Sequence, residues 1–368
     1  MEKTEWSDLP EELLDLIANR YSSNIDVLRI RSICKYWRST VTMSKERLQF
    51  RFNRYLPTSN KKIKAHLFPT TFFRITLPSS CPNNGWLIRT SQASKYRKIT
   101  LLSPISGELI IHSHQTLDLL KVGVSEIRQS YKINIFDGLK DEKIPSYIFS
   151  NYDMKYDKTP SDVFYRVAFL DNMFFAINRD KKIWCCKTRD GSRSWTKINN
   201  QVEDFSDIIL HMGRIYAVDL KGATWWISLS QLSAVQQTPS TPLDYYNYDS
   251  CEDTRLVEYC GDLCIVHQLS VTKHYIRRTV GFKVYKMDED LAKWVEVSSL
   301  GDKALIVAWD SCFTVVASEY HGCLKNAIYF FYDYGENLKV FKLDDGSIIE
   351  MTDISSQSCF HMFSLSFL

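Results

Sequence analysis

Two hydrophobic patterns divide the chain into a short helical part and a long β part. Over residues 7–41, apolar side chains recur at helical spacing on both sides of the polar break Ser22-Ser23-Asn24. From Trp86 onward, short apolar and aromatic runs such as Phe164 to Leu170 alternate with turn residues, which is typical of strands. The pattern therefore predicts an α+β multidomain protein with a small helical module followed by a mostly β region.

The helical part displays more apolar surface than it can bury by itself. Pro10 lies near the first helical position, and Glu11 and Glu12 stand in the first turn, where the helix dipole favours acids. The apolar side chains of this first helix spread over roughly 160° of its circumference: Leu13, Leu14, Leu16 and Ile17. In the second stretch one stripe carries Val27, Ile30, Cys34, Trp37 and Val41, while Leu28 and Ile33 lie off it. A segment of this length cannot bury both faces alone, so the pattern predicts an external partner.

The β part contains a repeat in which a turn dipeptide leads into an apolar strand and then an aromatic strand. Three clear copies and a looser fourth occupy residues 171–184, 212–226, 261–285 and 310–330. A period of roughly 40–50 residues matches a propeller blade of four short strands better than a sandwich, which has no such period. We therefore expect a β-propeller whose blade number the repeats leave open.

Turn- and loop-forming residues such as Pro, Gly and Asn suggest the boundaries between these parts. The helical pattern continues to about Tyr55, a linker follows at Pro57 to Asn60, and a further loop spans Pro78 to Gly85. The prediction is a helical module over 1–45, a helical extension and linker over 46–85, and the β region over 86–368. Between Gln236 and Asp253 the sequence predicts a long loop, either a binding loop on the propeller rim or a loose insertion.

Charge and cysteine content narrow the possible partners and compartments. The formal net charge of +3 is too small to indicate nucleic-acid binding. A basic run between Lys35 and Lys64 contains Glu46 as its only acid, and we interpret it as a solvated face that steers an acidic protein partner, with nucleic-acid contact or a nuclear address as alternatives. The ten cysteines are scattered, which favours free thiols in a reducing compartment. Neither a signal peptide nor a membrane span is expected.

Two runs of the helical part carry a family pattern, Leu9-Pro10-Glu11-Glu12-Leu13-Leu14-Asp15-Leu16-Ile17 and the run from Asp26 to Arg38. The resemblance of these runs is to the F-box, although Tyr21-Ser22-Ser23 replaces the Leu-Pro common at the break. It implies docking on a Skp-family adaptor through Leu9, Pro10, Leu13, Leu14, Ile17 and Leu28. It also implies that Ile33, Cys34 and Trp37 hold the helices together and complete the partner face.

The β part contains a turn from Leu102 to Glu108, and Trp195 and Trp294 stand at strand starts. In these features it is similar to plant F-box proteins with a C-terminal kelch-like β-propeller, whose Asn-Pro-Leu-Ser-Gly turn the first one resembles with Ser103 in place of Asn. The double glycine of kelch repeats is missing. The resemblance covers most of the chain from Trp86 onward and implies a target-binding propeller.

Motifs for catalysis, metals and cofactors are weak. The sequence contains no nucleophile elbow, phosphate-binding glycine loop, zinc-protease helix or dinucleotide fingerprint. Cys260, Cys264 and His267 are close enough for a metal site, but alternate residues of a strand point to opposite faces, so buried blade positions are the preferred interpretation. The pair Trp225-Trp226 is interpreted as blade core and rim rather than a ligand cage. We expect no cofactor and no metal.

Together these patterns predict a non-catalytic, substrate-recognition subunit of a Skp-cullin-F-box ubiquitin ligase. Its expected partners are a Skp adaptor, through it a cullin scaffold, and an unidentified target protein, without nucleic acid or membrane. The expected location is the nucleus, the cytoplasm or both. The alternative is a binding protein outside any ligase that sequesters a regulatory protein through its propeller. An enzyme acting through the propeller channel is the third hypothesis, and it lacks a convergent set of acids, bases or metal ligands.

Overall fold

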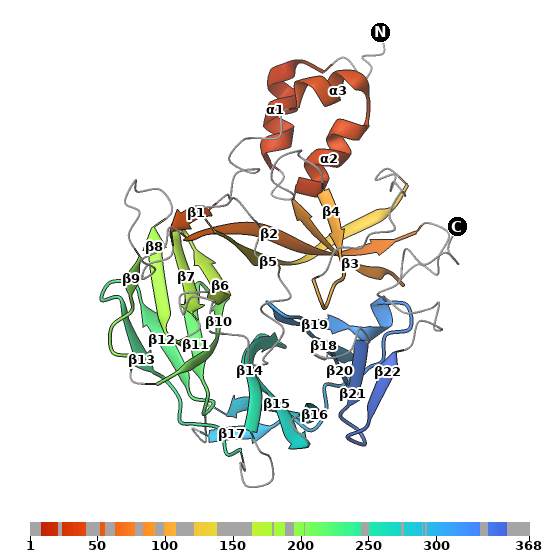
Figure 1. Cartoon of the computed structure of the whole chain (residues 1–368). Coiled ribbons are helices and arrows are strands. Elements are labelled where there is room, and N and C mark those ends of the chain that lie inside the picture. The colour runs from red at the N-terminus through yellow and green to blue at the C-terminus, as the bar shows by residue number, and fades with distance from the viewer. Residues whose placement is uncertain are drawn as a thin grey trace.

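The structure is a computed structural model that describes most of the chain between Leu9 and Met351. The residues that it describes are 9–20, 24–41, 52–55, 63–77, 84–92, 99–107, 121–137, 164–178, 180–187, 195–201, 203–243, 250–273, 276–288, 290, 293–331 and 338–351. In Figure 1, a small group of helices stands on the outer side of a ring of β-sheets.

Three short helices form the N-terminal module, as the hydrophobic pattern predicted. They are α1 (Glu11–Arg20), α2 (Asn24–Ser32) and α3 (Lys35–Thr40). Cys34 is the N-cap of α3, and its sulfur accepts a hydrogen bond from the backbone N–H of Trp37 at 3.4 Å. Six buried side chains form the core of the module: Leu14, Ala18, Val27, Ile30, Trp37 and Val41.

Five antiparallel or mixed sheets follow one another along the chain and form the blades of a propeller (Figure 1). The first contains β1 (Phe52–Tyr55), β2 (Ile63–Thr76), β3 (Trp86–Gln92), β4 (Ile99–Leu102) and β5 (Gly123–Asp137). The second contains β6 (Phe164–Leu170), β7 (Met173–Asn178), β8 (Ile183–Lys187) and β9 (Thr196–Lys197). The third contains β10 (Phe205–His211), β11 (Arg214–Asp219), β12 (Thr224–Ser228) and β13 (Ser233–Gln236).

The fourth and fifth sheets complete the ring. The fourth contains β14 (Ser250–Tyr259), β15 (Asp262–Lys273), β16 (Ile276–Asp288) and β17 (Lys293–Glu296). The fifth contains β18 (Lys303–Val307), β19 (Cys312–Val316), β20 (Ala327–Phe331), β21 (Leu338–Lys342) and β22 (Ile348–Met351), with a short 3₁₀ turn at Ala317–Glu319. The strands β6, β10, β14 and β19 pack next to one another from sheet to sheet, so they lie nearest the propeller axis.

The repeat seen in the sequence corresponds to hairpins within the blades. In the second, third and fourth sheets the turn dipeptide joins the first two strands, and the aromatic strand is the third. Asp171, Met212 and Cys260 have positive φ at these turns, as do Gly213 and Gly261. Tight two-residue hairpins need this left-handed backbone, which explains why turn residues recur at fixed places. The strand predictions for this region are confirmed.

The looser fourth copy belongs to a blade with a different topology. In the fifth sheet, β19 folds back on β18, and β20 then pairs with the other edge of β18 in parallel. The turn before β19 therefore precedes the innermost strand, whereas in the other copies it follows that strand. The first blade has no copy of the repeat, because its central strand β2 pairs along its whole length with β5, a strand that comes much later in the chain.

The predicted helical extension is wrong where the structure describes it. Residues 52–55 form β1, and residues 63–76 form β2, so strands of the first blade precede the expected start of the β region at Trp86. The run from Thr70 to Phe73 consists of β-branched and aromatic residues, which favour a strand. The rest of the expected helix, residues 42–51, and the linker at 57–60 lie outside the described residues.

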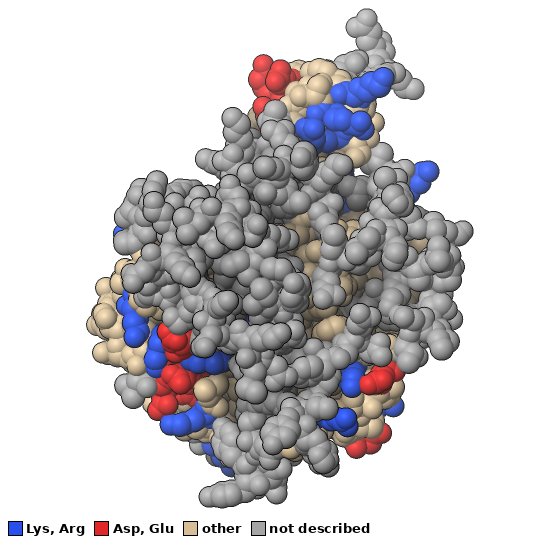
Figure 2. Space-filling model, in the orientation of Figure 1, with Lys and Arg blue, Asp and Glu red and all other residues tan. Residues whose placement is uncertain are grey.

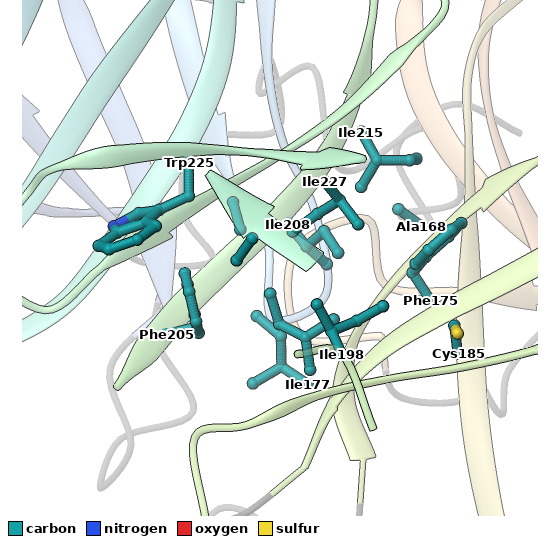
Figure 3. Close-up of a cluster of buried hydrophobic side chains, with 13 residues drawn as sticks. Ala168, Phe175, Ile177, Cys185, Ile198, Phe205, Ile208, Ile215, Trp225 and Ile227 are labelled. Atoms are coloured by element: carbon teal, nitrogen blue, oxygen red, sulfur yellow. The ribbon is translucent and has the colours of Figure 1, made fainter. Parts of the chain in front are cut away.

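Each blade packs against its neighbours through alternating side chains. Between the second and third sheets the buried cluster in Figure 3 includes Phe175, Ile177, Phe205, Ile215 and Ile227. Similar clusters join the third sheet to the fourth and the fourth to the fifth. Because every sheet buries both faces, the strands read as nearly continuous apolar runs rather than as a strict alternation.

The ring closes between the first and fifth blades. The backbone N–H of Gly85 donates to the carbonyl of Glu319 at 2.8 Å, and the N–H of His321 donates to the carbonyl of Gly85 at 3.0 Å. Arg74 and Glu319 form an ion pair at 2.8 Å beside this contact. Phe72 packs against Phe313 across the same junction. Among the described residues, closure therefore depends on side-chain packing, an ion pair and a short backbone bridge.

Four charged side chains link the inner strands, and we call them the inner ionic cluster: Arg166, Asp207, Asp253 and Arg255. Arg166 Nη2 lies 2.7 Å from Asp253 Oδ2, and Arg255 Nε lies 3.2 Å from Asp207 Oδ2. Both arginines also donate to the carbonyl of Trp309, in the turn between β18 and β19. The cluster therefore connects four blades. Burial raises the pKa of Asp253, but the two guanidinium groups outweigh burial and hold it below its ordinary value.

The described part of the predicted long loop is held in place by hydrogen bonds and by one buried side chain. Residues 237–243 follow β13, and Leu243 is buried between the third and fourth blades. The carbonyl of Pro239 accepts a hydrogen bond from Trp294 Nε1 at 2.7 Å, and Thr241 Oγ1 lies 2.8 Å from His267 Nε2. This segment therefore fastens two blades together, while residues 244–249 lie outside the description and the strand β14 already begins at Ser250.

Candidate functional site

Four large apolar side chains of the helical module are exposed, and they form two pairs. Leu13 and Leu16, with 46% and 62% of their surface exposed, lie three residues apart on α1 and so share a side of that helix. Ile33 and Tyr36, at 50% and 44%, lie at the junction of α2 and α3 and in the first turn of α3. We call these four residues the helical apolar face. A module with its own core does not need them for folding, so they are available to a partner.

Two of the predicted contact residues lie inside the module. Leu14 is 0% exposed and Trp37 is 6% exposed, and both belong to its core. Leu9, Ile17 and Cys34 are half-buried against that core. These five side chains therefore belong to the core of the module or pack against it, beneath the helical apolar face. Of the nine predicted contact residues, the structure places Pro10, Leu13 and Ile33 in exposed positions.

Leu28 has a different neighbour, the propeller. It packs against the buried residues Phe73, Ile75, Ile88 and Val122 on one face of the first blade. Next to it, Arg29 Nη2 donates to the carbonyl of Val122 at 3.1 Å. The helix α2 thus attaches the module to the first blade. Of the two residues that lie off the main apolar stripe in the sequence, Leu28 makes this contact and Ile33 belongs to the helical apolar face.

Leu16 and Tyr36 are exposed members of the helical apolar face that were not among the predicted contact residues. The signal for Leu16 was its spacing of three from Leu13, because residues three apart lie on the same side of a helix. Tyr36 lies one residue before the buried Trp37, on a different side of α3. Helical spacing relative to one buried anchor was therefore sufficient to find both.

The charge of the module is divided between its helices. Glu11 and Glu12 are exposed at the start of α1, whereas Lys35 and Arg38 are exposed on α3. Figure 2 shows acidic and basic side chains on different sides of the module. The basic side accompanies Ile33 and Tyr36, so α3 offers an apolar contact bordered by positive charge. Most of the basic run predicted between Lys35 and Lys64 lies outside the described side chains.

The metal interpretation of Cys264 and His267 does not fit the geometry. Cys264 lies in the cluster between the fourth and fifth blades, whereas its neighbour Ile265 faces the third blade. His267 shares the face of Ile265, and its two ring nitrogens lie within 3.0 Å of the hydroxyls of Thr241 and Thr254. Within the described residues no three His, Cys, Asp or Glu side chains gather closely enough to hold a metal ion.

His267 is expected to make stability depend on pH. Burial lowers its pKa from 6.5 to about 4, so the unfolded chain takes up a proton below pH 6.5 that the folded chain binds only near pH 4. The free energy of unfolding should therefore fall by up to about 3 kcal/mol between these pH values. Urea unfolding across this range tests the prediction. In His267→Gln the fall should be smaller by that amount, and an identical pH profile in both proteins would contradict it.

No described helix has the length and apolar character needed to cross a membrane. The described residues thus offer a helical apolar face beside a closed propeller, and neither a metal cluster nor a membrane-spanning helix accompanies it.

Comparison with known proteins agrees with this architecture. A family model described as "KIB1-4 beta-propeller" matches residues 55–344, which include the strands β2 to β21. Its start at residue 55 supports the early beginning of the propeller. Whether the blades are of the kelch type stays a prediction.

Relatives from Arabidopsis thaliana extend the similarity over the helical part. F-box protein At2g26160 is 63% identical over 90% of this chain and 96% of its own length. F-box protein At4g35733 is 47% identical over 98% of both chains. At3g25750, whose name also contains the term F-box, is 80% identical over 100% of this chain and 99% of its own. The chain therefore belongs to the family of plant F-box proteins that carry a KIB1-4 β-propeller.

Proposed function

We propose that the chain is the substrate-recognition subunit of a Skp-cullin-F-box ubiquitin ligase. In this proposal the helical module binds a Skp-family adaptor, and through it a cullin scaffold, while the propeller holds a target protein for ubiquitination and proteasomal degradation. The names of the relatives support the adaptor role. The observation that carries the proposal is the helical apolar face, which the module's own core leaves uncovered.

The energetics agree with stable but reversible adaptor binding. A large apolar side chain gains about 1.5–3 kcal/mol on complete burial, so each half-exposed member of the face contributes on the order of 1 kcal/mol when a partner covers it. Association loses about 4–15 kcal/mol of translational, rotational and side-chain freedom. The four residues therefore need the support of neighbouring contacts, such as Pro10 and the basic residues of α3, to give firm binding.

The proposed role requires no chemistry from this chain. A receptor that holds the target beside the ligase converts a bimolecular encounter into an intramolecular one, often at millimolar effective concentration. The attachment of α2 to the first blade through Leu28 and Arg29 serves this role, because it limits the positions that a bound target can take relative to the adaptor. Location in the nucleus or the cytoplasm is part of the proposal and follows from the ligase assignment.

The decisive variant carries Leu13→Asp together with Ile33→Asp. Both side chains are about half exposed, so the substitutions should leave the module folded but place two charges in the adaptor contact. Recovery of a co-expressed Skp adaptor on the tagged chain should fall at least about tenfold. The matched control is Leu220→Asp with Leu324→Asp, two propeller positions with 39% and 38% exposure, and it should recover the adaptor like the wild type.

Circular dichroism on both double variants shows whether the helices persist. Equal adaptor recovery by the Leu13/Ile33 variant and the wild type, with helices intact, would refute the assignment of the docking face.

A further inference from the structure

Arg128 of the first blade points toward the propeller axis. It lies on β5, an edge strand that pairs with β2 and packs against β6 of the second blade. Yet the groups that act electrostatically on its guanidinium belong to the third, fourth and fifth blades, and they are Asp207, Arg255, Glu258 and Cys312. The side chain of Arg128 therefore enters the space that the inner strands surround, next to the inner ionic cluster.

Arg128 has no hydrogen-bond or ion-pair partner among the described residues. Its Nε atom is sealed from solvent without an acceptor. Arg255 is 2% exposed, and its Nη2 atom is in the same state, although its Nε and Nη1 atoms donate to Asp207 and to the carbonyl of Ala308. Two guanidinium groups from different blades thus bring unpaired donors to the axis. Native proteins rarely leave buried donors empty, and an ion or a water molecule usually fills such a place.

The positive charges at the axis outnumber the carboxylates that face them. Arg128 stands beside Arg166 and Arg255, whose carboxylate partners in the inner ionic cluster are Asp207 and Asp253. Burial lowers the pKa of Arg128, so the attraction of the nearby acids does not make up for the loss of water. A guanidinium group in a protein is not neutralised by losing its proton. The excess charge therefore needs a counter-charge.

The other charged groups near the axis do not supply this counter-charge. Glu258 is the second carboxylate that acts on the unpaired guanidinium, but its side chain is 55% exposed and lies 3.2 Å from His211. Arg89 and Asp310 form a separate buried pair, one to one. Lys181 adds a further positive charge within electrostatic range of the cluster. Within the described residues, the axis keeps an excess of positive charge.

We propose that a small free oxyanion of the phosphate type binds at the propeller axis between Arg128 and Arg255. Its oxygens accept hydrogen bonds from Nε of Arg128 and Nη2 of Arg255, because guanidinium groups match the geometry of phosphate oxygens. A free ion suits the site better than a segment of a target protein, since Arg255 is almost fully buried. The anion joins the first blade to the fourth, and its binding is independent of the proposed adaptor role.

Thermal unfolding of the full-length chain in phosphate and in chloride, at equal ionic strength, tests the site. At a phosphate concentration about tenfold above the dissociation constant, the wild-type midpoint should rise by about 2 °C relative to chloride. Arg128→Met removes the charge but keeps an apolar stem, so it should lose this rise. In chloride it should unfold at or above the wild-type midpoint, because it removes a buried charge without a counter-charge. The control Arg278→Met removes an exposed arginine of β16 and should keep the rise.

Calorimetric titration of phosphate into the folded proteins gives a second measurement. The wild type and Arg278→Met should bind about one phosphate per chain, and Arg128→Lys, which keeps the charge but loses the planar fork, should bind it more weakly. An equal rise of the midpoint in the wild type and Arg128→Met would show a general salt effect and overturn the inference. A wild type that shows neither a rise nor a binding heat overturns it as well, because water alone then fills the site.

Discussion

Asp207→Ala is expected to destabilise the propeller by about 3–5 kcal/mol, because it leaves two buried arginines with one shared carboxylate. Asp207 faces Arg255 at 3.2 Å and Arg166 at 3.5 Å, and its Oδ2 also accepts the backbone N–H of Leu256 at 2.9 Å. A guanidinium group in a protein is not neutralised by losing its proton. Removing the carboxylate therefore leaves buried positive charge and an unpaired backbone donor.

Denaturant unfolding followed by tryptophan fluorescence measures this loss. The matched control is Asp204→Ala, three residues earlier, whose carboxylate is 53% exposed and pairs with Lys182 at 2.8 Å. A surface ion pair contributes about 0–1 kcal/mol, so the control should stay close to the wild type. Equal midpoints for the two variants would show that the inner ionic cluster does not hold the blades together.

Trp37→Ala is expected to unfold the helical module while the propeller stays folded. A buried Trp contributes about 3–5 kcal/mol relative to Ala, and Trp37 is one of only six described side chains in the module's core. A core of this size cannot lose its largest member and remain folded. Helical ellipticity should fall, protease cleavage should concentrate before β2, and adaptor binding should disappear.

Tyr36→Ala is the control for this experiment, since its side chain is exposed beside Trp37. It should keep the helices and weaken adaptor binding only moderately. A Trp37→Ala protein that retains its helical signal and its protease resistance would contradict the assignment of Trp37 to the core of the module.

The sequence predicted the parts of the fold that depend on local chemistry. Turn residues such as Met212, Gly213 and Gly261 have the positive φ that tight hairpins need, so turn residue types located hairpins in three blades. Leu13 and Leu14 could both be recognised as apolar, but only the packing of α2 and α3 decides that Leu14 is buried and Leu13 exposed.

Features that depend on distant parts of the chain were not predictable in this way. The strand β2 is completed by β5, which begins 47 residues after β2 ends, and the long separation hid the first blade. Arg166 and Asp253 come from different blades, and charged residues within a strand are typically assigned to its solvent side.

Hydrogen exchange of the full-length chain, with and without a Skp-family adaptor, tests whether the helical apolar face is the docking surface. The adaptor should slow amide exchange in α1 and α3, which carry the helical apolar face, and leave the turns at Met212 and Cys260 unchanged. Protection confined to the propeller turns, or no protection anywhere in the chain at saturating adaptor, would contradict it.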